Sequence, residues 1–129
     1  MAVFIADTDV LVDFLKGVGE AERIRIELQT GRLCTTTIAA FELWAGAGSH
    51  QQIAAVETLL GALSILPLDL SSARRAGEIQ RDLARRGAGI GMADSLISGI
   101  CLEHEAILLT RNQEHYQRVP GLRFDFHFG

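Results

Sequence analysis

Short apolar runs alternate along this chain with longer segments in which apolar residues recur at helical spacing. A short run bounded by turn residues is typical of a buried strand, whereas apolar residues three and four positions apart are typical of an amphipathic helix. The strand-like runs are 3–6, 33–36, 65–68, 107–110 and 122–126, and the last of them is expected at an edge. Helices are expected at 10–15, 21–28, 37–47 and 51–63, from a cap at Ser71 or Ser72 to a stop at Gly87, and at 92–104.

This succession of strands and helices predicts an α/β fold of three layers, with helices on both faces of a mainly parallel sheet of about five strands. Asp7 and Asn112 directly follow strands, and Glu42 and Asp94 lie in helices that leave the same edge of the sheet. Ligands of open α/β sheets bind at the carboxyl ends of the strands. These four residues are therefore candidates for one site, although no two of them are close in sequence.

Two of these four residues, Glu42 and Asp94, can also be explained by structure alone. Glu42 lies in the predicted helix 37–47, where Ile38, Phe41 and Ala45 share one side, and it can equally be an exposed residue of the outer face. Asp94 falls in the first turn of its helix, where the helix dipole favours a carboxylate that has no function. The hydrophobic pattern alone leaves both alternatives open.

Composition restricts the choice of protein class. A length of 129 residues with 48% hydrophobic residues predicts a single globular domain over 1–129. The apolar runs are too short to span a bilayer, and the N-terminus has no export signal, so we expect no membrane association and a cytoplasmic location. Cys34 and Cys101 lack metal-ligand spacing and are expected to be buried thiols.

A net charge of −4 does not suggest a general nucleic-acid binder. It does not exclude a metal-dependent nuclease, because such an enzyme needs clustered acids that bound cations neutralise. Arginine supplies all positive charge except that of Lys16, and Arg85 and Arg86, beside a glycine-rich loop, are candidate phosphate contacts. That loop, 87–91, lacks the spacing of a dinucleotide-binding or P-loop motif.

The sequence around Asp7 is also compatible with a phosphatase. An aspartate directly after an apolar strand is the nucleophile of haloacid-dehalogenase-like phosphatases, and 7–11 resembles their opening motif. Those enzymes need a downstream lysine, as response-regulator receivers do, and the only lysine here is Lys16 in the first helix. The absence of such a lysine argues against Asp7 as a phosphate-accepting nucleophile.

Five segments occur in an order and spacing that carry a family resemblance. They are 7–13 (DTDVLVD), 41–46 (FELWAG), 90–97 (IGMADSLI), 109–112 (LTRN) and 119–122 (VPGL). Together they resemble PIN-domain ribonucleases of the VapC toxin type, and the resemblance spans essentially the whole chain. It implies a PIN-like fold and an endoribonuclease toxin of a type II toxin–antitoxin system that hydrolyses RNA phosphodiester bonds.

The resemblance also implies the roles of individual residues. Asp7, Glu42, Asp94 and Asn112 would form the catalytic site, the first three as ligands of Mg²⁺ or Mn²⁺. Substrate contacts would come from Thr8, Arg85, Arg86 and Arg111. A small antitoxin protein would occlude the acidic groove, and the toxin would be a homodimer within a larger toxin–antitoxin assembly.

The chain departs from the family pattern at Asn112, where an aspartate is frequent. An amide can coordinate a metal through its oxygen but brings no negative charge, which puts a second metal ion in doubt. Asp9 is a candidate to restore that charge or to cap the first helix. A PIN-like interaction module that has lost activity is the non-enzymatic alternative.

Overall fold

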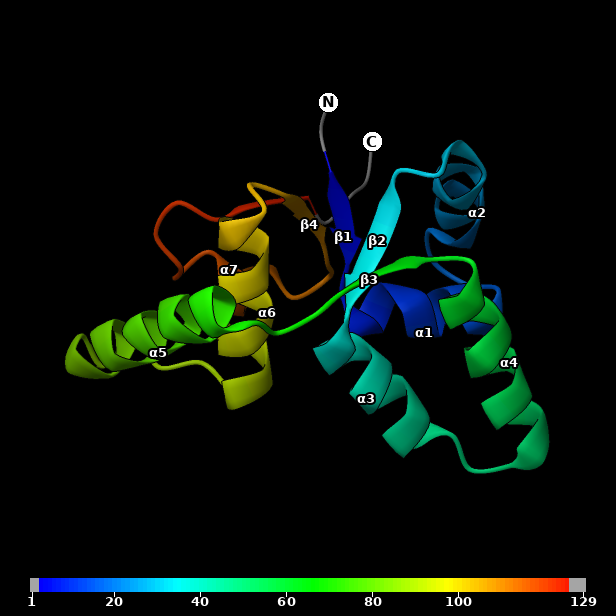
Figure 1. Ribbon diagram of the computed structural model, residues 1–129, viewed down its shortest axis with the longest axis horizontal. Helices are drawn as coiled ribbons and strands as arrows, with labels where there is room; N and C mark the ends of the chain where they lie inside the picture. Colours follow the sequence, from blue (N-terminus) through cyan, green and yellow to red (C-terminus); the bar gives the residue numbers. More distant parts are fainter. Residues whose placement is uncertain (1–2, 126–129) are drawn as a thin grey trace.

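The computed structural model describes residues 3–125 and shows an α/β fold around one parallel sheet (Figure 1). The strand order in the sheet is β3-β2-β1-β4-β5, and all four strand pairs are parallel. The strands are β1 (Phe4–Ala6), β2 (Leu33–Thr36), β3 (Ser64–Leu66), β4 (Ile107–Leu109) and β5 (Arg123–Asp125). The prediction of a parallel sheet with an edge strand at the end of the chain is confirmed, although Phe126 lies outside the described residues.

The first six helices occur in the expected order, and a seventh, after β4, was not predicted. The helices are α1 (Thr8–Lys16), α2 (Ala21–Thr30), α3 (Thr37–Gly46), α4 (His50–Gly61), α5 (Leu70–Arg85), α6 (Met92–Glu103) and the short α7 (Gln113–Tyr116). Helices α1, α3 and α6 all begin at the carboxyl edge of the sheet, which is the lower edge in Figure 1. This arrangement places the first turns of three helices around the ends of β1 and β4.

Successive residues of the central strand point into two different cores. Ala6 packs with Val10 and Leu11 of α1 and with residues of α2, α3 and α4. Ile5 packs on the other face of the sheet with Ile97 of α6 and with further residues of α6 and α7. Since both cores exclude water and each fully buried Leu or Ile side chain contributes about 1.5–3 kcal/mol, the sheet is held rigidly between its helices.

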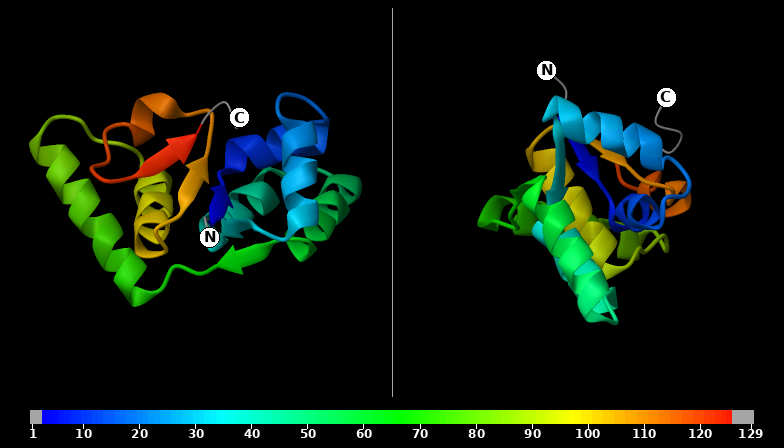
Figure 2. Two further views of the ribbon diagram at one scale, coloured as in Figure 1. Left: turned by 90° about the horizontal axis from the view of Figure 1, so that it is seen from above. Right: turned by 90° about the vertical axis from the view of Figure 1, so that its right-hand side faces the viewer.

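Helix α5 packs chiefly on α6 and forms an outer flank of the molecule (Figure 2). The two helices approach closely at Gly99, where an added Cβ would lie 2.5 Å from the carbonyl oxygen of Ser72. Gly87 ends the α5 segment with a φ of +67°, as predicted. The predicted cap was wrong: Asp69, and neither serine, caps α5 by accepting from the backbone N–H of Ser72 at 2.8 Å.

The hydrophobic pattern did not identify the buried side of α3. Ala39, Ala40 and Leu43 are buried, whereas Phe41 is 68% exposed and Ala45 is also exposed. An all-round apolar helix has no pattern that distinguishes its faces, so only packing against the sheet and α4 selects one. Cys101 is buried and Cys34 is half-buried, and both are free thiols. No helix of the described residues combines the length and apolar character needed to cross a membrane.

Candidate active site

Asp7 lies where β1 ends and α1 begins. Its backbone N–H donates to the carbonyl oxygen of Leu109, which continues the β1–β4 pairing and fixes the position of the residue. The side chain is the N-cap of α1 and accepts from the N–H of Thr8 at 2.8 Å through Oδ1. Through Oδ2 it accepts from the hydroxyl of Thr110 at 2.8 Å. The carboxyl is thus held by the first residue of α1 and by the residue after β4, and Asp7 is 6% exposed.

Burial first, then the nearby charge of Asp9 and, more weakly, that of Asp94 raise the pKa of Asp7 from its usual 3.8 to about 7. The hydrogen bonds from Thr110 and Thr8 oppose this rise and do not cancel it. A carboxylate that is removed from water beside other carboxylates is costly to ionise without a counter-charge. The position therefore favours a bound cation.

Asp9 is not the cap of α1, contrary to one of its two predicted roles. It lies in the first turn, and its Oδ2 accepts from the backbone N–H of Arg111 at 3.0 Å and from the Thr110 hydroxyl at 3.4 Å. Its Oδ1 is buried and has no hydrogen-bond partner within residues 3–125. Burial raises the pKa of Asp9 as well. Asp9 thus joins α1 to the loop after β4 and adds negative charge next to Asp7.

Asp94 faces the same region from the first turn of α6. Its Oδ1 accepts from the hydroxyl of Tyr116 at 3.1 Å. Its Oδ2 lies 2.8 Å from Nδ1 of His115 and 3.4 Å from Nδ2 of Asn112. Burial raises the pKa of Tyr116, and the charges of Asp7 and then Asp94 also raise it. Asp94 is connected to Asp7 through Asn112, whose backbone N–H donates at 3.0 Å to the Thr110 hydroxyl that bonds to Asp7.

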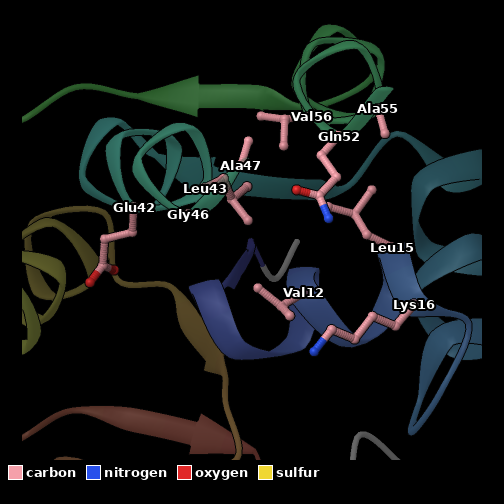
Figure 3. Close-up of a pocket in the computed structure, with 10 residues that line it drawn as sticks. All are labelled: Val12, Leu15, Lys16, Glu42, Leu43, Gly46, Ala47, Gln52, Ala55 and Val56. Carbon is pink, nitrogen blue, oxygen red and sulfur yellow. The ribbon is translucent and has the colours of Figure 1, made fainter. Parts of the chain in front are cut away.

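Glu42 reaches the site from α3 and is half-buried, so it is not on the exposed outer face. Its Oε1 accepts from the hydroxyl of Thr8 at 2.6 Å, which connects α3 to the residue next to Asp7. Glu42 also stands at the edge of a pocket between α1, α3 and α4, with a volume of about 240 Å³ (Figure 3). Figure 3 shows its carboxylate turned away from the pocket's apolar side chains, Leu43 and Val56 among them, with Lys16 on the α1 side.

The predicted arginine contacts are distributed differently from the acids. Arg111 follows β4 and forms an ion pair with Asp13 of α1, with Nε and Oδ2 2.8 Å apart. Arg86 pairs with Asp82 of its own helix at 2.6 Å, and Arg85 is exposed in the last turn of α5. Of these three arginines, Arg111 is the one bonded to the segments that carry Asp7 and Asp9.

The described residues contain no group of three or more His, Cys, Asp or Glu side chains arranged to hold a metal ion. Asp7 and Asp94 are connected through Thr110 and Asn112, whereas Glu42 is bonded to Thr8. The donor chemistry nevertheless fits a hard divalent cation, because the available ligands are carboxylate oxygens and the buried Asp7 has no positive partner among residues 3–125. Asp7 and Asp94 could thus bind the ion directly. Glu42 would bind it only after breaking its hydrogen bond with Thr8, or would act on it through a water molecule.

Sequence reasoning missed three residues that hold the acids in place. Thr110 bonds to Asp7, and His115 and Tyr116 bond to Asp94. One local signal was available: Asn112 and His115 have the spacing of a helix cap, and the Asn112 side chain accepts from the His115 N–H at 3.4 Å. That signal predicts a turn after β4, but the turn's contact with α6 spans more than 20 residues of sequence.

Comparison with known proteins gives consistent matches along the chain. A sequence model of the PIN domain matches residues 4–122. The chain is similar to the tRNA(fMet)-specific endonuclease VapC of Salmonella typhimurium, with 31% identity over 129 residues that cover 97% of this chain and 98% of that protein. Ribonuclease VapC2 of Haemophilus influenzae is 28% identical over 127 residues, which cover 95% of this chain and 96% of that protein.

Solved structures show the same similarity in three dimensions. The crystal structure of DNA-bound VapBC from Salmonella typhimurium contains a chain that matches with a TM-score of 0.87 and 32% identity, covering 97% of this chain and 98% of that one. The structure of VapBC-1 from nontypeable Haemophilus influenzae matches with a TM-score of 0.82 and 29% identity, covering 95% and 96%. The similarity thus extends over the entire sheet and its flanking helices.

Proposed function

Because this chain belongs to the PIN-domain family, and within it to the VapC type, we propose that it is a metal-dependent endoribonuclease toxin. The observation that carries this proposal is the hydrogen-bonded connection of Asp7 to Asp94 at the carboxyl edge of the sheet. It runs from the Thr110 hydroxyl, which donates to Asp7, to Asn112, whose backbone N–H donates to Thr110 and whose amide approaches Asp94 at 3.4 Å. Two carboxylates held together by separate elements, one of them buried, suit a divalent cation and the phosphodiester that it would bind.

In this proposal Asp7 and Asp94 are the direct ligands of Mg²⁺ or Mn²⁺. Such an ion, when bound, would neutralise the scissile phosphate and lower the pKa of an attacking water. Thr8 and Thr110 keep Asp7 oriented through the backbone N–H of Thr8 and the hydroxyl of Thr110. Glu42, which the Thr8 hydroxyl orients, is placed to accept the proton of the attacking water or to complete the ligand set.

The positive groups have separate roles. The guanidinium of Arg111, exposed and anchored by Asp13, is the favoured contact for the RNA backbone. Arg85 and Arg86 remain candidates for a more distant phosphate contact at the end of α5, with Arg86 first having to leave Asp82. Asn112 brings an amide to the site and no charge, so a single tightly bound ion is expected.

The proposed partners are a small antitoxin protein and a second copy of this chain. The VapBC structures from Salmonella typhimurium and Haemophilus influenzae support the first. An arginine-bearing segment would be attracted to the acidic site, and the adjacent pocket could take an apolar side chain (Figure 3). The exposed Phe41 and Trp44 of α3 support the second, since large exposed apolar groups that lie together favour association.

The test is RNA cleavage mapped on total RNA by the wild type and by Asp94→Asn, each with Mn²⁺ and with a chelator. We expect cleavage by the wild type that the chelator abolishes, and a rate for Asp94→Asn lower by at least about 100-fold, because a ligand charge is lost. Gln113→Ala, an exposed substitution nearby, serves as the matched control. If folded Asp94→Asn cleaves as fast as the wild type, the site assignment fails. If the wild type neither binds Mn²⁺ nor cleaves RNA, the inactive interaction module is favoured.

A further inference from the structure

Within the described part of the chain, the three side-chain donors that hold Asp94 all come from the short segment 112–116. Tyr116 donates its hydroxyl hydrogen to Oδ1, and His115 and Asn112 approach Oδ2. Tyr116 is fully buried and His115 is half-buried. The two residues that separate Asn112 from His115, which are Gln113 and Glu114, are exposed. The polar side chains on one face of the α7 turn therefore all contact one carboxylate of α6, that of Asp94.

The distances identify which nitrogen carries the proton in this group. His115 Nδ1 lies 2.8 Å from Asp94 Oδ2 and 3.0 Å from Asn112 Nδ2. An amide nitrogen can only donate, and a carboxylate oxygen can only accept. The 2.8 Å contact is a hydrogen bond when His115 Nδ1 carries the proton and donates to Asp94. His115 Nδ1 and Asn112 Nδ2 then lie close together because both donate to Asp94 Oδ2.

We propose that His115 is a positioning residue that, through its Nδ1–H, holds Asp94 in the orientation required to bind the divalent cation. This inference rests on the proposed function. With one donor on Oδ1 and two on Oδ2, rotation of the carboxylate would break hydrogen bonds, so the orientation is fixed before any ion arrives. Groups of this kind around a ligating carboxylate typically change metal affinity or activity by about 10–100-fold when they are removed.

The contribution of His115 differs from those of its neighbours in the same segment. Tyr116 also packs in the core against α6, so its loss would disturb folding as well as the site. Asn112 caps α7 and approaches Asp94 only at 3.4 Å. His115 makes the shortest contact to Asp94 and has a side chain that is 41% exposed, so its substitution tests the hydrogen bond with little loss of packing.

The experiment compares His115→Asn with His115→Leu. Asparagine places an amide N–H near the position of Nδ1, and leucine has nearly the same shape without a donor. Mn²⁺ affinity is measured by isothermal titration calorimetry without RNA, and a thermal melt in chelator verifies the fold of each variant. We expect His115→Leu to weaken Mn²⁺ binding by about 10–100-fold and His115→Asn to remain within about threefold of the wild type. Gln113→Ala is the control on the same turn, and its Mn²⁺ affinity should not change.

Several outcomes would overturn the proposal. Wild-type Mn²⁺ affinity in His115→Leu would show that the hydrogen bond is unimportant, and equal losses in both variants would show that the imidazole ring matters and not its donor. A raised KM for RNA with unchanged Mn²⁺ affinity would instead make His115 a substrate contact. If His115→Leu does not fold, His115→Ala replaces it in the same comparison.

Asp94→Asn distinguishes failure of this inference from failure of the proposed function. If Asp94→Asn loses Mn²⁺ binding while His115→Leu retains it, only the role of His115 is wrong. If Asp94→Asn binds Mn²⁺ as tightly as the wild type, the metal site itself is wrong.

Discussion

Removing the charge of Asp7 should make the metal-free protein less sensitive to pH. The folded state raises the pKa of Asp7 from 3.8 to about 7, chiefly by burial, so the folded protein holds this proton more tightly than the unfolded chain does. The resulting stability is fully present below pH 3.8 and is lost as the pH rises through 7. At about 1.4 kcal/mol for each pH unit between the two pKa values, the loss is about 4 kcal/mol.

The assay is urea unfolding followed by circular dichroism in chelator, at several pH values between 4.5 and 8. The free energy of unfolding of the wild type should fall as the pH rises, and that of Asp7→Asn should fall less, so that the variant is the more stable protein at pH 8. Asparagine can still accept from the Thr8 N–H, and its amide can donate to the Thr110 hydroxyl, so the local structure is preserved. Asp82→Asn, at an exposed ion pair of α5, is the matched control.

Divalent cations supply a second readout of the same reasoning. Mn²⁺ should stabilise the wild type more at pH 8 than at pH 5, because protons compete for the ligand oxygens, and it should stabilise Asp7→Asn much less. The reasoning is refuted if the metal-free wild type has the same free energy of unfolding at pH 4.5 and pH 8. It is also refuted if Asp7→Asn retains the full pH dependence.

Two further substitutions test the packing and the bonding around the site. Gly99→Ala should lower the free energy of unfolding by about 1–3 kcal/mol, because the new Cβ would lie 2.5 Å from the Ser72 carbonyl oxygen. The control is Gly77→Ala, whose Cβ meets no described atom within 4 Å and which should leave the free energy of unfolding unchanged or raise it. Equal effects of the two substitutions would contradict the close approach of α5 and α6. Thr110→Val removes a donor that lowers the Asp7 pKa, so the metal-free protein should lose more stability with rising pH than the wild type does, and an unchanged or smaller loss in urea unfolding would argue against this bond.

Local sequence was sufficient for much of the fold and part of the site. The alternation of strand-like and helical segments predicted the parallel sheet, because the side chains that specify each element are neighbours in sequence. Asp7 was placed correctly at the end of β1, and the order of the five motifs led to Glu42 and Asp94 through family resemblance. The structure connects Asp7 to Asp94 through Thr110 and Asn112 and leaves Glu42 bonded to Thr8, while the roles of these acids as ligands stay predictions.

Tertiary structure decided what depends on contacts between distant segments. The sequence left Asp9 as a candidate cap of the first helix, but Asp7 caps α1, whereas Asp9 accepts from the backbone of Arg111 across 102 residues. His115 and Tyr116 carried no recognisable motif, yet they hold Asp94 from 21 and 22 residues away. Hydrophobic periodicity records which residues prefer burial, and only the packed fold determines which buried surfaces and polar groups meet.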